Sequence, residues 1–301
     1  MYFSFLVFIC CPSEIIAQHV DQKILDLRAK SVANIDSMIA GRTLKRNSLL
    51  FKVIPSSIKE SLDPAVFYEY VLQEKKEAVM AKFKRFGVNI RALERKRQEY
   101  KKNQEKTKKC FAISFEEASK KLIKVQSVAI RKRARDVFEL FTNSSIPLIA
   151  RENDQTPACA TDGKVLIDEK LFKKFKVCEQ KYLFAHEIIH LLEKHNTEEK
   201  VLKILLKEKH GKLSSVMRRN LFELSRSYET IADIKGVLRG GSLFAKGYEG
   251  FAKKEVEEES DNEAMIINAT TSSHPARRHR YEAAKLLKKE LELLACVTKI
   301  K

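Results

Sequence analysis

The chain has 301 residues, with 58 Lys and Arg against 40 Asp and Glu, and a formal net charge of +18. This length is ample for a buried core in one large or two modest domains, and only 9 Gly and 6 Pro favour a mainly helical chain. The cations could attract nucleic acid or an anionic membrane surface, but they are spread along the chain, with no Trp and no recognised nucleic-acid motif. We therefore expect no specific nucleic acid as a partner, and association with an anionic membrane surface stays open.

Residues 1–17 are predicted to form a signal peptide. Tyr2–Cys11 is an apolar run of about ten residues, too short to span a bilayer but typical of a signal-peptide core, and Ala17 suits a cleavage point. Because no Lys or Arg precedes the run, a buried terminal strand, a mis-set start codon and a lipid anchor at Cys10 or Cys11 are alternatives. We expect an exported protein, periplasmic or secreted, with a membrane-associated lipoprotein as the other choice.

Residues 18–112 are predicted to be a helical region, with a long helix from about Pro64 into the charged stretch 91–109. The region could be a prodomain, a substrate-capturing arm or a cover for residues 113–301, which we take as the second domain. The elements of that domain are expected in this order: a helix ending near Phe141, strands at 145–150 and 158–167, helices at 179–194 and 214–238, a mobile Gly-rich loop at 236–250, and a closing helix at 280–297.

The segment His186–His190 reads His-Glu-Ile-Ile-His, a pattern whose spacing follows from a chemical mechanism. Residues four apart lie on one face of a helix, so both imidazoles can reach one metal ion. The carboxylate of Glu187 could then take a proton from a water molecule whose pKa the metal lowers, for attack on a peptide carbonyl. The alternative is a chance match on an ordinary helix. His195, five residues beyond His190, is expected at the surface, off the ligand face.

A metal site of this kind needs a third protein ligand. Glu193 and Asn196 stand where a metzincin has Gly and His, so a Glu ligand is expected, and Glu229 is the best candidate. Asp233 shares a helix face with Glu229 and could accept the second ring N–H of a ligand imidazole. A solvated acidic face is the alternative for this pair, but apolar residues lie between the two acids, which favours burial.

Three ordered motifs resemble the zinc metallopeptidases that include HtpX and the CAAX prenyl protease, family forty-eight of the metallopeptidases. The first is His186–His190, preceded by a segment at 157–167 that is similar to the family's edge strand. The second is Glu-Thr-Ile-Ala-Asp at Glu229–Asp233, and the third is His274-Pro275 followed by Arg280. The resemblance covers about 113–290. It implies a gluzincin-type zincin domain of the α+β class, mainly helical, with a small sheet and active-site helices.

The resemblance also implies roles for single residues. One zinc ion per chain would be bound by three side chains, with Glu187 as general base and acid and Asp233 orienting a ligand imidazole. His274 and Arg280 would complete the catalytic site, where either could stabilise an oxyanion. Polypeptide substrates would bind as an extended strand along Ala158, Cys159 and Ala160. The implied ligands of the zinc ion are His186, His190 and Glu229.

We therefore predict a zinc-dependent endopeptidase that acts on exported or misfolded proteins. No segment after the leader is long enough to span a membrane, which departs from HtpX and the prenyl protease and favours a soluble, exported branch. A latent or inactive zincin scaffold with a chaperone-like role is the alternative, its fourth ligand coming from His274 or from 236–250. Four cysteines follow the leader, either free or paired, and a bridge between Cys159 and Cys178 is one arrangement; the four are Cys110, Cys159, Cys178 and Cys296.

Overall fold

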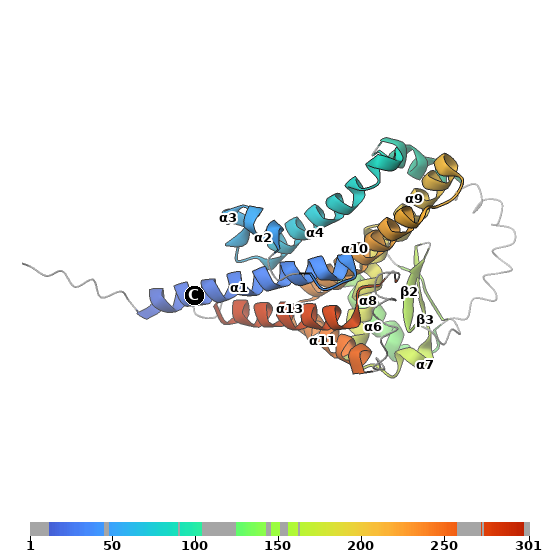
Figure 1. Ribbon diagram of the computed structural model, residues 1–301. Coiled ribbons are helices and arrows are strands. Elements are labelled where there is room, and N and C mark those ends of the chain that lie inside the picture. Colours follow the sequence, from blue (N-terminus) through green and yellow to red (C-terminus); the bar gives the residue numbers. More distant parts are fainter. Residues whose placement is uncertain are drawn as a thin grey trace, which may run out of the picture.

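The computed structural model describes residues 12–44, 48–89, 91–103, 125–142, 146–150, 156–161, 163–257, 272 and 274–297. These residues form a mainly helical structure with one three-stranded sheet, so the predicted α+β class is confirmed (Figure 1). The elements before the sheet are α1 (Pro12–Ala40), α2 (Leu49–Val53), α3 (Ser56–Lys59), α4 (Pro64–Ala81), η1 (Lys84–Phe86), a helix at 91–103 and α6 (Val128–Phe141). The later ones are β1 (Leu148–Ala150), β2 (Ala158–Thr161), β3 (Lys164–Ile167), α7 (Glu169–Phe172), α8 (Val177–Leu192), α9 (His195–His210), α10 (Ser215–Gly240), α11 (Ser242–Glu257) and α13 (Arg277–Val297).

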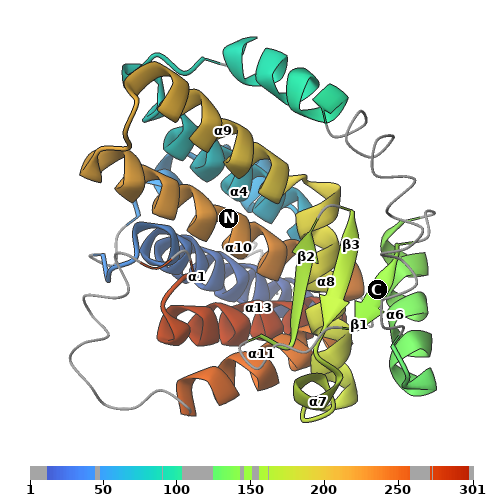
Figure 2. The same ribbon diagram turned by 90° about the vertical axis from the view of Figure 1, so that its right-hand side faces the viewer.

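The N-terminal helices pack directly on the helices of the C-terminal half. In both views α1 runs beside α13, and α1 and α4 both contact α10 (Figures 1 and 2). One hydrophobic core extends from Val32 to Leu287 across these elements. The boundary expected near residue 110 falls in 104–124, outside the described residues. The long helix expected from Pro64 is wrong, because the chain turns at Gly87 in the left-handed conformation (φ 72°) before the helix at 91–103.

The sheet has the order β1-β3-β2, with β1 parallel and β2 antiparallel to β3. It lies against α8 (Figure 2). The single strand expected at 158–167 is therefore wrong, since the chain reverses there and Gly163 adopts φ 80°. Asp162-Gly163 is a sequence signal for a hairpin. Apolar residues alternate on both sides of it, so the two strands look like one in the sequence. The hairpin leaves β2 as an edge strand beside α8.

The Gly-rich segment after Gly236 is not a loop. Helix α10 continues to Gly240, a turn follows at Gly241 (φ 71°), and α11 begins at Ser242. A Cβ atom on Gly247 would overlap the backbone carbonyl of Cys178 on α8. This glycine therefore allows close approach of two helices, which explains why a composition typical of a flexible segment occurs in an ordered one.

Cys159 and Cys178 both carry thiols, so the bridge considered between them is not formed. Cys110 lies outside the described residues, as do residues 1–11 of the expected signal peptide, while Pro12 begins α1. Among the described residues, no helix is both long and apolar enough to cross a bilayer.

A buried ion pair ties α1 to α13. Nε of Arg28 donates to Oε1 of Glu290 at 2.7 Å, and both side chains are fully buried. The hydroxyl of Tyr68 on α4 donates to the other carboxylate oxygen at 2.7 Å. Burial raises the pKa of Glu290 despite the neighbouring guanidinium. The pair therefore joins three helices, at the cost of placing charges in the core.

We expect Arg28→Met to lower the free energy of unfolding by about 3–5 kcal/mol, because it leaves the Glu290 carboxylate buried without its counter-ion. Urea denaturation at pH 7 measures the change. The double variant Arg28→Met/Glu290→Leu should be more stable than the single variant, since no unpaired charge is left. A double variant as unstable as the sum of the two single ones would contradict this account.

Candidate metal centre

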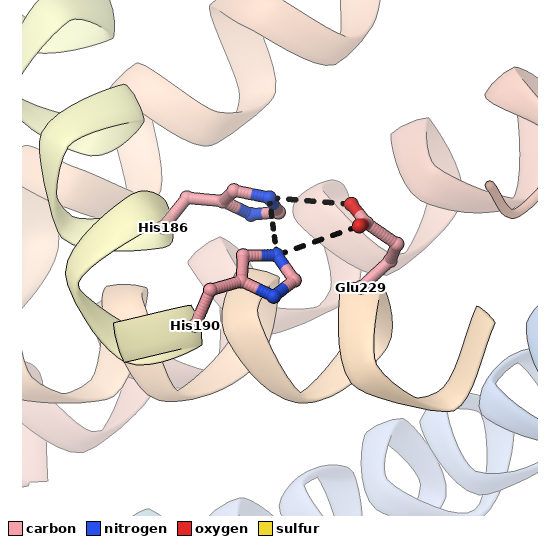
Figure 3. A group of neighbouring side chains, drawn as sticks. All are labelled: His186, His190 and Glu229. Atoms are coloured by element: carbon pink, nitrogen blue, oxygen red, sulfur yellow. Dashed lines mark hydrogen bonds and ion pairs between the residues drawn. The ribbon is translucent and has the colours of Figure 1, made fainter. Parts of the chain in front are cut away.

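Three side chains from two packed helices converge on one point. His186 and His190 lie one turn apart on α8, and Glu229 faces them from α10 (Figure 3). The two Nε2 atoms are 3.1 Å apart. Nε2 of His186 is 3.2 Å from Oε2 of Glu229, and Nε2 of His190 is 3.4 Å from Oε1. The structure thus brings together the three ligands that the sequence indicates.

The spacing of these atoms suits a tetrahedral metal ion. Ligand bonds of about 2.0–2.1 Å at tetrahedral angles place neighbouring ligand atoms about 3.3 Å apart, close to all three separations. Two imidazole nitrogens at this distance cannot both carry protons directed at each other. Within the described residues, the group that could hold a metal consists of these three side chains. A tetrahedral ion held by three protein ligands has one further position for water or a substrate.

Electrostatics favour a positive charge at this point. Burial alone would lower the pKa of His186, but the carboxylates of Asp233 and Glu229 raise it to about 10. Burial would likewise raise the pKa of Glu229, yet His190, His186 and His274 hold it well below its usual range. A divalent cation supplies the same positive charge without crowding two ring protons.

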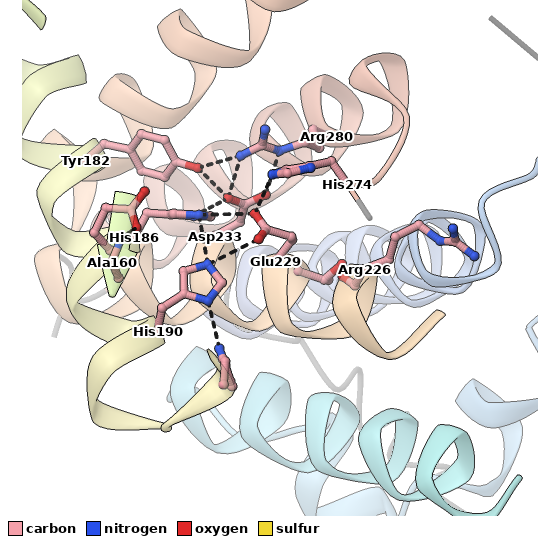
Figure 4. Close-up of polar contacts among 12 residues, drawn as sticks. Ala160, Tyr182, His186, His190, Arg226, Glu229, Asp233, His274 and Arg280 are labelled. Atoms are coloured by element: carbon pink, nitrogen blue, oxygen red, sulfur yellow. Dashed lines mark hydrogen bonds and ion pairs between the residues drawn. The ribbon is translucent and has the colours of Figure 1, made fainter. Parts of the chain in front are cut away.

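Asp233 lies between His186 and the guanidinium of Arg280. Its Oδ1 lies 2.8 Å from Nδ1 of His186, which orients that imidazole. Nε and Nη2 of Arg280 donate to the two carboxylate oxygens at 2.9 and 2.8 Å, and the hydroxyl of Tyr182 also donates to one of them (Figure 4). The hydroxyl of Tyr248 donates to the other. Asp233 is fully buried. It is therefore a buried acceptor, and the solvated acidic face considered for it is excluded.

Arg280 faces Asp233 and not the three ligands. Besides Asp233, it donates to Oε2 of Glu255 on α11 at 2.9 Å and to the hydroxyl of Tyr182 at 3.3 Å. The guanidinium is buried, and burial would lower its pKa, but the carboxylates of Asp233 and Glu255 raise it well above its usual value. Its donors are thus engaged by the protein, which gives Arg280 a positioning role through Asp233 in place of the expected contact with an oxyanion.

His274 lies at the mouth of the site. Its Nε2 is 3.6 Å from Oε2 of Glu229, and 60% of its side chain is exposed. Arg226, a turn before Glu229 on α10, donates to the carbonyl of Ser272 at 2.8 Å and to that of Ile39 at the end of α1 at 2.8 Å. The buried Arg226 therefore holds the segment before His274 against α10. The sequence around Arg226 gives no signal for this role.

His195 supports the site from behind. It is 1% exposed, so the prediction of a surface position is wrong. Its Nδ1 is 3.1 Å from Nδ1 of His190, and its ring stacks on Tyr228 with centroids 4.3 Å apart. The ammonium of Lys76 on α4 lies over the ring of Tyr228 at 5.4 Å. A continuous series of contacts thus runs from α4 to one of the two imidazoles that could hold a metal.

The error at His195 has a local cause. On an uninterrupted helix, a residue five positions after His190 points away from its face. Helix α8 instead ends at Leu192, and Lys194 takes the left-handed conformation (φ 56°) before α9 starts. That turn brings His195 back beneath His190. A non-glycine residue in this conformation leaves no pattern in a single sequence.

The edge strand presents alternate residues to α8. The N–H of Asp168 donates to the carbonyl of Pro157 at 2.9 Å, which makes this a hydrogen-bonded pair. Such pairs alternate along an antiparallel ladder, so the main-chain N–H and C=O of Cys159 point to β3. Those of Ala158 and Ala160 point away from β3, to the open side of the edge strand. Main-chain binding of a substrate at Cys159 is therefore excluded by its pairing within the sheet.

Glu187 contacts the edge strand. Its Oε2 accepts the N–H of Ala160 at 2.6 Å, and the carbonyl of Ala160 accepts Nδ2 of Asn196 at 2.7 Å. Both outward groups of Ala160 are thus engaged by side chains from α8 and α9. Glu187 is buried. It follows His186 directly in the sequence, and its side chain points to β2. Its carboxylate is consequently fixed in place by the strand along which a substrate was expected to bind.

Comparison with models of protein families, with curated proteins and with solved structures found no match.

We expect Asp233→Asn to weaken divalent-metal binding by about 10–100-fold, because the amide cannot both accept from His186 and balance the charge of Arg280. Competition with a chromogenic chelator measures the affinity. Glu255→Gln is the matched control, since it removes the other carboxylate on Arg280 without touching His186. Equal losses in the two variants would contradict a specific role for Asp233.

His195→Phe should weaken metal binding by about tenfold while leaving the free energy of unfolding within about 1 kcal/mol, because it removes Nδ1 but keeps a ring stacked on Tyr228. His210→Phe, at the exposed end of α9, serves as the control for a lost imidazole. Unchanged metal affinity in His195→Phe would show that the contact with His190 does not orient the ligand.

Proposed function

We propose that this protein is a zinc-dependent endopeptidase, similar to the HtpX and CAAX prenyl protease family, with a gluzincin-type site. The observation that carries the proposal is the tetrahedral spacing of His186, His190 and Glu229, with Glu187 in the same helix and directed at an edge strand. Two imidazoles and one carboxylate form the ligand set of known zinc peptidases. The predicted export supports substrates among exported or misfolded proteins.

The residues of the site have distinct tasks in this proposal. Bound by the three side chains, zinc supplies Lewis-acid activation of water and of a carbonyl group. Glu187 accepts the proton of the attacking water and returns it to the leaving amine, while the N–H of Ala160 fixes the orientation of its carboxylate. His274, partly exposed at the mouth, is placed to donate to an oxyanion. Asp233 and Arg280 act by holding His186.

A substrate would lie along β2 as an extended strand, by pairing with the outward main-chain groups of Ala158 and Ala160. At Ala160 both groups are engaged, by Glu187 and Asn196. A peptide in this register must displace the amide of Asn196 before it can bind the carbonyl of Ala160. Replacing Ala160 with Pro would also release Glu187, so this change cannot test strand pairing by itself.

The same contacts favour a latent zincin scaffold as the second candidate. If Asn196 stays on Ala160, the edge strand is closed to a peptide and the metal centre serves the fold alone. Such a protein would bind zinc as tightly as the proposed peptidase does, but it would cleave no polypeptide. Proteolysis by the wild-type protein therefore separates the two functions.

We expect Glu187→Gln to retain one zinc ion per chain and to cleave an unfolded fluorogenic casein at least about 100-fold more slowly than the wild type, because an amide cannot accept the proton. Elemental analysis measures the zinc, and a chelator should abolish wild-type cleavage. Glu193→Gln, just beyond the end of α8, is the control. Absence of zinc from the wild type would exclude the proposed function, and full activity of Glu187→Gln would exclude the assigned base.

A further inference from the structure

A groove of about 490 Å³ extends from the metal centre between α9 and α10. His190 and Glu229 line its inner end, Leu221 and Phe222 line its wall, and Arg218 lies at the outer end. The inner end thus shares two side chains with the metal centre. A polypeptide bound at the metal centre therefore has this groove beside it, and the groove can take the residues on one side of the scissile bond.

The outer end of the groove carries an uncompensated positive charge. Lys203 pairs with Glu199 across one turn of α9, at 2.5 Å, so these two charges largely cancel. Arg218 is exposed and forms no ion pair with any residue that the structure describes. The carboxylate of Glu229 is directed at the two imidazoles. Among the residues that the structure describes, Arg218 is therefore the unpaired cation that lines the groove, with apolar walls on the way to it.

The length of the groove sets the position of that anionic group. Glu229 and Arg218 lie on the same helix, with about 16 Å between them at a rise of about 1.5 Å per residue. An extended peptide covers about 3.3 Å per residue, and the long arginine side chain shortens the required reach. An acidic side chain three to five residues from the scissile bond would therefore meet Arg218.

We propose that this groove is a specificity subsite for polypeptides with Asp or Glu three to five residues from the cleaved bond, bound through Arg218. The inference rests on the proposed peptidase function and adds a substrate class to it. The apolar walls fit the residues between the bond and the acidic group, while the guanidinium can bind a carboxylate through two parallel N–H donors.

The neighbouring arginine provides a matched control. Arg219 carries the same charge on the same turn of α10 but lines a different pocket, which lies toward α1 and α4. Both arginines are exposed, so neither replacement disturbs the core. Reversal of charge at 218 and at 219 changes the net charge of the protein equally. Any difference between the two variants then reports on the groove alone.

The test uses fluorogenic peptides that differ only in having Glu, Gln or Lys at one position, with that position moved along both sides of the scissile bond. Wild type should cleave the Glu peptide with a kcat/KM about three- to tenfold above that of the Lys peptide at one position three to five residues away. Arg218→Glu should reverse this preference, and Arg219→Glu should keep it. Added salt should reduce the difference, because the pair is exposed.

Cleavage by the wild type without a preference for Glu, or equal effects of Arg218→Glu and Arg219→Glu, would overturn the subsite and leave the peptidase function standing. If the wild type cleaves no peptide, the proposed function fails, and fluorescence anisotropy with the zinc-loaded protein then decides the subsite. Tighter binding of the Glu peptide that is lost in Arg218→Glu would then support recognition of acidic peptides by the groove, without cleavage. Equal binding of the Glu and Lys peptides would reject it.

Discussion

The contact between Asp233 and Arg280 is the interaction on which the rest of the site depends. Asp233 is fully buried. Its carboxylate balances the charge of the Arg280 guanidinium, accepts hydrogen bonds from two tyrosine hydroxyls and contacts Nδ1 of His186. Arg280 in turn joins α13 to α10 and, through Glu255, to α11. A buried charge of either sign is tolerated only with such complete pairing. The orientation of the first metal-binding imidazole is therefore set by the packing of three helices.

The second imidazole depends on the N-terminal region in a similar way. Lys76 on α4 lies over Tyr228, which stacks on His195, which contacts His190. Arg226 adds a further tie, from the end of α1 to the segment that carries His274. These contacts make α1 and α4 part of the site's support. A removable prodomain would be expected to cover the mouth of the site, whereas these helices pack behind its ligands.

The sequence predicts well those features that depend on spacing within one helix. The 3.6-residue repeat places His186 with His190 on one helix face and Glu229 with Asp233 on another. The meeting of the two pairs was expected from the need for a third ligand and from the resemblance, and the structure brings them together. What the sequence misses depends on single backbone conformations or on close packing. The left-handed Lys194 returns His195 to the site, and α11 packs on α8 at Gly247, where a loop was predicted. Neither event changes hydrophobic periodicity, so pattern analysis has no signal for it.

In the proposed peptidase, the position of Glu187 would link catalysis to substrate binding. Its carboxylate is held by the N–H of Ala160, and the carbonyl of the same residue is held by Asn196. A peptide that pairs with β2 competes for these groups, so binding of a substrate and release of the proposed base are coupled at one residue. The coupling requires that a productive peptide gain contacts elsewhere, because it replaces two hydrogen bonds that already exist. The groove leading to Arg218 is a part of the described surface beside the metal centre that offers such contacts.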